Sequence, residues 1–125
     1  MKSKELNHEI MRWMSRLTIM LSALFLSFSL ATSAYATEIQ MGYNGNLVFN
    51  PSEATINSGE SITFVNNDLP PHNIVFVNGH EDLNRPDLNF VKGDTVDITF
   101  SEPGEYEYQC EPHAGAGMKG VIHVK

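Results

Sequence analysis

Short apolar or alternating runs, separated by turn residues, fill the chain from residue 37 to residue 125. No stretch there keeps the 3.6-residue period of a long amphipathic helix. Turn pairs such as Asn50-Pro51, Asn78-Gly79 and Pro103-Gly104 interrupt the runs. The candidate strands are residues 38–42, 46–49, 54–57, 61–66, 72–77, 95–100, 105–109 and 119–124. This pattern predicts an all-β domain, either a two-sheet sandwich or a flattened barrel.

Alternation along the strands indicates which side chains face the interior, because successive residues of a strand point to opposite sides. Tyr106, Tyr108 and Cys110 share one parity, and the acidic residues Glu105 and Glu107 share the other. The acidic face must be solvated, so we expect the tyrosines and the cysteine to be buried. Residues 74–77 are apolar on both parities, which predicts a strand covered on both faces.

The N-terminal third has the order of a secretory signal. Basic residues come first, an apolar run of 14 residues follows at 17–30, and a small-x-small site, Ala34-Tyr35-Ala36, ends it. A retained membrane anchor is the alternative, but a spanning helix needs about 20 apolar residues. The sequence therefore predicts a cleaved signal peptide at 1–36, an exported protein and one domain at 37–125.

The charge of the predicted domain limits its partners. Residues 37–125 carry four basic and thirteen acidic side chains, a formal net charge of −9. Nucleic acid is therefore excluded as an expected partner. The carboxylates either keep a small domain soluble or steer it toward a positively charged partner.

The single cysteine of the chain cannot form an intramolecular disulfide, so Cys110 needs another role. Residues 106–120 read YEYQCEPHAGAGMKG and place Cys110, His113 and Met118 at C-x2-H-x4-M. Pro112 stiffens this loop, and its glycines let the backbone fold back. Thiolate, imidazole and thioether together select copper, and two histidines, one cysteine and a weak methionine form blue-copper electron-transfer sites. His72 is the candidate for the second imidazole.

Each of these residues also has an ordinary structural explanation. Met118 could fill a gap in the core, the histidines could be satisfied in loops, and Cys110 could be a buried small residue. Three rival functions also fit parts of the pattern: a thiol enzyme with a histidine base, a zinc site, and an interaction module without metal. An enzyme gains nothing from Met118, and methionine is a poor zinc ligand, so the joint pattern favours copper.

Two segments resemble the plastocyanin family, particularly its cyanobacterial members. They are NNDLPPHNIVF at 66–76 and YQCEPHAGAGMKG with the following VIHV, and the resemblance runs from about residue 39 to residue 124. It implies an eight-stranded Greek-key β-sandwich, one copper ion, and an electron carrier rather than an enzyme. The copper ligands that it implies are His72, Cys110, His113 and Met118, with Asn73 as the neighbouring asparagine that ties the first-ligand strand to the cysteine loop.

The resemblance also implies a place in the cell and two partners. We expect a monomer in the thylakoid lumen, peripheral to the membrane at most, that accepts electrons from cytochrome f and passes them to photosystem I. The alternative is a periplasmic carrier like pseudoazurin or amicyanin that serves another oxidoreductase.

The chain departs from the plastocyanin pattern at two places. Gln109 stands where the family commonly has a tyrosine, and the segment 80–93 is shorter than usual. Glu81, Asp82 and Asp87 are expected to form a reduced acidic patch there. His80 and His123 are expected at the surface, away from the metal.

Overall fold

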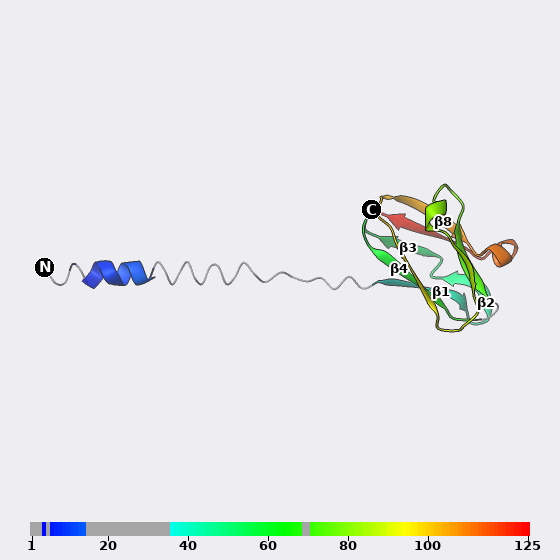
Figure 1. Cartoon of the computed structure of the whole chain (residues 1–125), viewed down its shortest axis with the longest axis horizontal. Coiled ribbons are helices and arrows are strands. Elements are labelled where there is room, and N and C mark those ends of the chain that lie inside the picture. Colours follow the sequence, from blue (N-terminus) through cyan, green and yellow to red (C-terminus); the bar gives the residue numbers. More distant parts are fainter. Residues whose placement is uncertain (1–3, 5, 15–35, 69–70) are drawn as a thin grey trace. The chain divides into compact units, whose positions relative to one another are not determined.

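The computed structural model describes residues 4, 6–14, 36–68 and 71–125 (Figure 1). The chain divides into two compact units, Met1–Ser33 and Ala34–Lys125. Residues 6–14 are helical, and the large apolar side chains of that helix are exposed. Among the described residues, no helix is both long enough and apolar enough to cross a membrane. The apolar run of the predicted signal, 17–30, lies outside the described residues.

The second unit is a sandwich of two β-sheets. The four-stranded sheet has the order β2-β1-β4-β7, and the five-stranded sheet has the order β3-β9-β8-β5-β6. The strands are β1 (Thr37–Tyr43), β2 (Asn46–Asn50), β3 (Glu53–Ile56), β4 (Ser61–Asn66), β5 (His72–Phe76), β6 (Arg85–Asn89), β7 (Thr95–Thr99), β8 (Gly104–Gln109) and β9 (Lys119–Val124). The predicted all-β sandwich is therefore confirmed.

The core lies between the two sheets and is built from the inward parities of the strands. Tyr106, Tyr108 and Cys110 are buried, as predicted, while Glu105 and Glu107 are exposed. An aromatic cluster of Phe49, Phe64, Phe76, Phe100, Tyr106 and Tyr108 fills much of the core. Most of its ring pairs meet edge to face, which is a favoured aromatic geometry.

The structure differs from the sequence-based strand assignment in the middle of the chain. β6 lies in a segment for which no strand was predicted, and it contains Pro86, which lacks a backbone N–H donor. A proline is tolerated there because β6 is the edge strand of its sheet. The expectation that residues 74–77 are covered on both faces was wrong: Val75 is only half-buried, and Val77 lies beyond β5 with an exposed fraction of 51%.

Strand pairing brings two distant segments of the chain together. β5 runs antiparallel to β8, with Val75 opposite Gln109, so the start of β5 lies beside the end of β8. His72 is the first residue of β5, and Cys110 directly follows β8. A short 3₁₀ helix, η2 (Glu111–Ala116), then leads to β9. A second one, η1 (Glu81–Leu83), precedes β6.

Candidate metal centre

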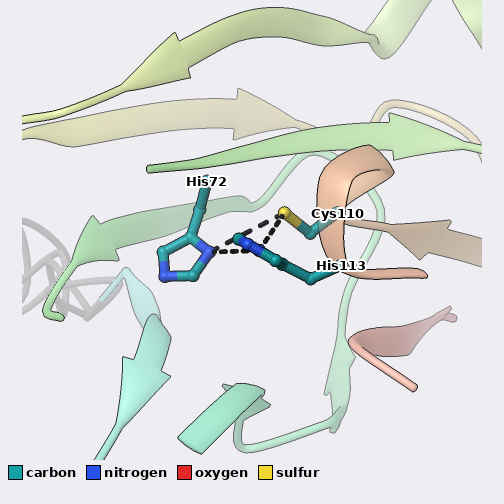
Figure 2. A group of neighbouring side chains, drawn as sticks. All are labelled: His72, Cys110 and His113. Carbon is teal, nitrogen blue, oxygen red and sulfur yellow. Dashed lines mark hydrogen bonds between the residues drawn. The ribbon is translucent and has the colours of Figure 1, made fainter. Parts of the chain in front are cut away.

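The side chains of His72, Cys110 and His113 point their donor atoms at one another where the start of β5 meets the end of β8 (Figure 2). The Nδ1 atoms of His72 and His113 are 3.2 Å apart, and the Sγ atom of Cys110 lies 3.7 Å from the first and 3.3 Å from the second. The point equidistant from these three atoms lies about 2.0 Å from each, close to the roughly 2.0–2.3 Å at which such donors hold a transition-metal ion. The donor triangle therefore fits one small ion.

Met118 is brought to the same region by the loop itself. The backbone N–H of Cys110 donates to the Met118 carbonyl, and the Met118 N–H donates to the His113 carbonyl. Gly117 adopts the left-handed conformation, with φ of 89°, that ends η2 and turns the chain back toward β9. Pro112 lies in the first turn of η2, where its fixed φ is compatible with the helix. The side chain of Met118 is fully buried.

The orientation of the His72 ring is set from outside the donor triangle. Its Nε2 lies 2.9 Å from the Asp68 carbonyl oxygen, which can only accept a hydrogen bond. Nε2 must therefore carry the proton, and Nδ1 presents its lone pair to the site. The Asp68 carboxylate is itself fixed, because it accepts a hydrogen bond from the Gly45 N–H at 3.1 Å and lies 3.7 Å from the Lys92 Nζ.

Gly42 makes room for this arrangement. A Cβ at this position would lie 2.9 Å from the Asp68 Cβ and 3.0 Å from the His72 Nε2, which is closer than real Cβ contacts normally are. The residue also has φ of 80°, where side-chain-bearing residues are strained. A glycine at this bulge between β1 and β2 is therefore what allows the imidazole to seat.

Asn73 ties together the two segments that carry the candidate donors, which is the role that the plastocyanin resemblance implies for it. Its Oδ1 accepts a hydrogen bond from the Glu111 N–H at 2.9 Å, and its Nδ2 donates to the Glu111 Oε2 at 2.8 Å and to the Pro86 carbonyl at 3.0 Å. The chain thus joins β5, β6 and η2 directly behind the donor atoms.

Burial controls the protonation of two of the donors. It lowers the pKa of His72 below the ordinary 6.5, although the hydrogen bond to Asp68 partly opposes this effect. Burial also raises the pKa of the Cys110 thiol, backbone N–H groups of Asn73 and His113 oppose that rise, and the Glu111 carboxylate adds to it. In the apoprotein, His72 is therefore neutral and ready to bind a metal at pH 7, whereas Cys110 gives up a proton when a metal binds.

His80 and His123, which were expected at the surface, lie away from the donor triangle and are partly exposed. The ring of His80 stacks over Tyr106 at 4.0 Å, and His123 lies 3.5 Å from Glu105 on the outer face of the sheet. Neither belongs to the metal-ligating group that the described residues form. The sequence did not predict the supporting roles of Asp68, Gly42 and Glu111. In particular, no spacing pattern indicates that Gly42 must be a glycine with positive φ.

Comparison with known proteins places this site in a family. Residues 36–125 match the family model of copper binding proteins of the plastocyanin/azurin family. The chloroplastic plastocyanin of Physcomitrium patens is 44% identical over 106 residues, which cover 78% of this chain and 63% of that protein. Plastocyanin A/B of Petroselinum crispum is 46% identical over 96 residues, covering 70% of this chain and 98% of that protein.

Solved structures agree with the sequence matches. The oxidized plastocyanin of Dryopteris crassirhizoma aligns with a TM-score of 0.64 and 29% identity, over 71% of this chain and all of that chain. Amicyanin of Paracoccus versutus aligns with a TM-score of 0.62 and 32% identity, over 76% of this chain and 86% of that chain. Since the family model spans most of the chain and the donor set suits copper, this chain belongs to the plastocyanin/azurin family of copper-binding proteins.

Proposed function

We propose that His72, Cys110, His113 and Met118 bind the copper ion of this blue-copper electron carrier. The observation that carries the assignment is the convergence of two imidazole nitrogens and one thiol sulfur within 3.7 Å of one another. Two histidines, one cysteine and a soft methionine are the ligand set of copper electron-transfer sites, in which nothing is chemically transformed. Members of this family are electron-transfer proteins rather than enzymes.

The protein's own groups prepare the site for one-electron transfer. Copper, when bound, supplies the Cu(I)/Cu(II) couple. His72, Cys110 and Met118 are fully buried, so the protein excludes water from three sides of the site. The hydrogen bonds of His72 to Asp68 and of Asn73 to Glu111 fix the donors before the metal arrives. This rigidity keeps the donor positions similar in both oxidation states, which favours fast transfer.

His113 is the donor through which electrons leave and enter in this proposal. It is the member of the four that is only half-buried, so its ring lies nearest the solvent. Residues 115–117 beside it are exposed and small, and Pro71 is half-exposed. Leu88, Phe90 and Val91 are also exposed, and Asn89 between them pairs with His72. We propose that a partner docks on this apolar surface around His113.

The physiological route is part of the proposal. The plastocyanin resemblance and the chloroplastic relatives support a monomeric carrier in the thylakoid lumen that takes electrons from cytochrome f and gives them to photosystem I. The signal pattern at 1–36 supports export. The alternative is a periplasmic carrier for another oxidoreductase, and the similarity to amicyanin supports it.

The copper assignment is tested by reconstitution. Purified apoprotein that receives Cu(II) should turn intensely blue, with one copper per chain, and ascorbate should bleach the colour. Replacing His113 with Ala should abolish both the blue absorption and electron transfer, whereas His123→Ala, on the outer sheet face, should leave them intact. An unchanged blue spectrum in the His113 variant would remove that residue from the ligand set.

The partners are tested separately. The reduced protein is mixed with photosystem I, and re-reduction of the photosystem is timed after a flash. Re-reduction that accelerates with protein concentration supports the photosynthetic route. A blue, redox-active protein that leaves the flash-oxidised photosystem unreduced supports the periplasmic alternative.

A further inference from the structure

Glu111 and Asn73 form a closed pair of hydrogen bonds directly behind two of the proposed ligands. Glu111 follows Cys110 in the chain, and Asn73 follows His72. The Glu111 N–H donates to Asn73 Oδ1 at 2.9 Å, and Asn73 Nδ2 returns a hydrogen bond to Glu111 Oε2 at 2.8 Å. Any change in the relative position of these two residues must therefore move His72 against Cys110.

The pair admits one arrangement of the Asn73 amide. Asn73 has an exposed fraction of only 2%, and its second N–H hydrogen donates to the Pro86 carbonyl at 3.0 Å. Both hydrogens and the oxygen of this amide are thus satisfied, so a flipped amide would leave buried polar atoms unpaired. The Glu111 carboxylate is the acceptor for the other Asn73 N–H hydrogen, and no second acceptor among the described residues is bonded to it.

Glu111 also brings a negative charge close to the metal centre. Its side chain is exposed, and no lysine, arginine or histidine forms an ion pair with it in the described part of the chain. A neighbouring negative charge favours the more positive oxidation state of an ion.

We propose that Glu111 is a positioning residue of the metal centre, which holds His72 and Cys110 in register through Asn73 and whose carboxylate charge lowers the reduction potential. This inference rests on the proposed copper ligands. The Glu111 side chain would then act in two ways: it accepts a hydrogen bond from Asn73, and it places a negative charge near the metal. Two substitutions of Glu111 can separate these effects.

The test compares Glu111→Gln, Glu111→Ala and Glu107→Gln with the unmodified protein. Glutamine keeps an oxygen acceptor for Asn73 but removes the charge, and alanine removes both. Glu107→Gln makes the same charge change at an exposed position on the outer face of β8. Redox titration gives the midpoint potential, and the thiolate absorption and copper hyperfine splitting report the donor geometry. Proton exchange of the Asn73 side-chain amide in the apoprotein reports the hydrogen bond without any metal.

The expected result is a higher potential in both Glu111 variants, with a larger rise than in Glu107→Gln. Glu111→Gln should keep the spectrum and the slow amide exchange, and Glu111→Ala should change the spectrum and accelerate the exchange. A rise no larger than that of Glu107→Gln overturns the charge effect, and unaltered spectrum and exchange in Glu111→Ala overturn the positioning. Failure of the unmodified apoprotein to turn blue with copper rejects the proposed function instead, and the exchange experiment then still decides whether Glu111 holds Asn73.

Discussion

His72 owes its position to a residue that has no side chain. Gly42 leaves the space that the His72 imidazole and the Asp68 backbone occupy, and it lies 30 residues before the histidine that it accommodates. The Asp68 carbonyl then selects the protonated nitrogen of the ring. The Nδ1 atom of His72 is therefore available to a metal because the Asp68 backbone comes close enough to bind the opposite ring nitrogen.

Gly42→Ala should therefore damage both stability and the metal centre. The added methyl group meets the His72 Nε2 at 3.0 Å, and the positive φ adds strain, so we expect a loss of at least about 3 kcal/mol in the free energy of unfolding. Gly45→Ala is the matched control, because it has φ of 75° but no atom within 4 Å of an added Cβ. It should lose only the strain energy, about 1–2 kcal/mol, and bind copper normally. Equal losses in the two variants, measured by denaturant unfolding of the apoproteins, would contradict this explanation.

The lowered pKa of His72 predicts a pH dependence of apoprotein stability. Burial is the main cause, so the unfolded chain binds a proton at higher pH than the folded chain does. Stability is thus fully present above the ordinary pKa of 6.5 and falls as the pH drops from there toward the lower pKa of the folded state. Unfolding of the apoprotein at pH 7.5 and pH 5 should show this loss, and His72→Gln should reduce it. If the His72→Gln protein keeps the full pH dependence of stability, groups other than His72 cause it.

The candidate ligands could be predicted from sequence because their chemistry is unusual. A lone cysteine followed by histidine and methionine at fixed spacing in a glycine-rich loop narrows the possible metals without any coordinates. The contacts of Gly42, Asp68 and Glu111 could not be predicted in the same way, since they depend on how close separate backbones come after folding.

At the scale of elements, β8 and β9 are in tight contact where Tyr108 faces Gly120. The tyrosine ring lies across the glycine, and a Cβ at Gly120 would overlap its Cζ and Oη atoms. The same ring packs against Phe49, Phe64 and Phe76 in the core, so it has little room to move aside. This contact holds β8, which leads into Cys110, against β9, which follows Met118.

Gly120→Ala should consequently destabilise the sandwich strongly. Overpacking of a filled core costs about 1–3 kcal/mol or more, and we expect the upper end because a whole aromatic ring must shift. Gly115→Ala in η2 is the control: its φ is not positive and no atom lies within 4 Å of an added Cβ, so its effect should stay within about 0.5 kcal/mol. Thermal or denaturant unfolding measures both, and a tolerated alanine at 120 would show that the aromatic cluster can relax.

The strands that could be predicted are those with alternating or apolar side chains between clear turns. β6 could not, because Arg85, Pro86 and Asp87 carry no such alternation. Hydrogen bonds from distant residues hold β6 in place instead, including those that the Asn66 side chain donates to the Asn89 and Val91 carbonyls. β5 looked fully covered because its apolar run is continuous, yet Val75 on its outward parity is only half-buried and Val77 beyond the strand is exposed.

At the scale of the whole domain, the net charge of −9 on residues 37–125 dominates long-range interactions. Such a charge attracts cations and repels anions over about 30 Å at 0.01 M salt but only about 10 Å at 0.1 M salt. Electron transfer from a small cationic donor should therefore slow as salt is added, and transfer from an anionic donor should accelerate. Stopped-flow rates across that salt range test this, and two donors with the same salt dependence would exclude electrostatic steering.

The order of strands in the five-stranded sheet has a consequence for biogenesis. β9 is the last strand of the sandwich along the chain, yet it lies inside the sheet between β3 and β8, and Met118 directly precedes it. A polypeptide emerging from a ribosome or threading through a translocation pore cannot close this sheet until β9 has passed. The sheet, and the donor cluster beside it, can therefore form only after the whole domain has been released.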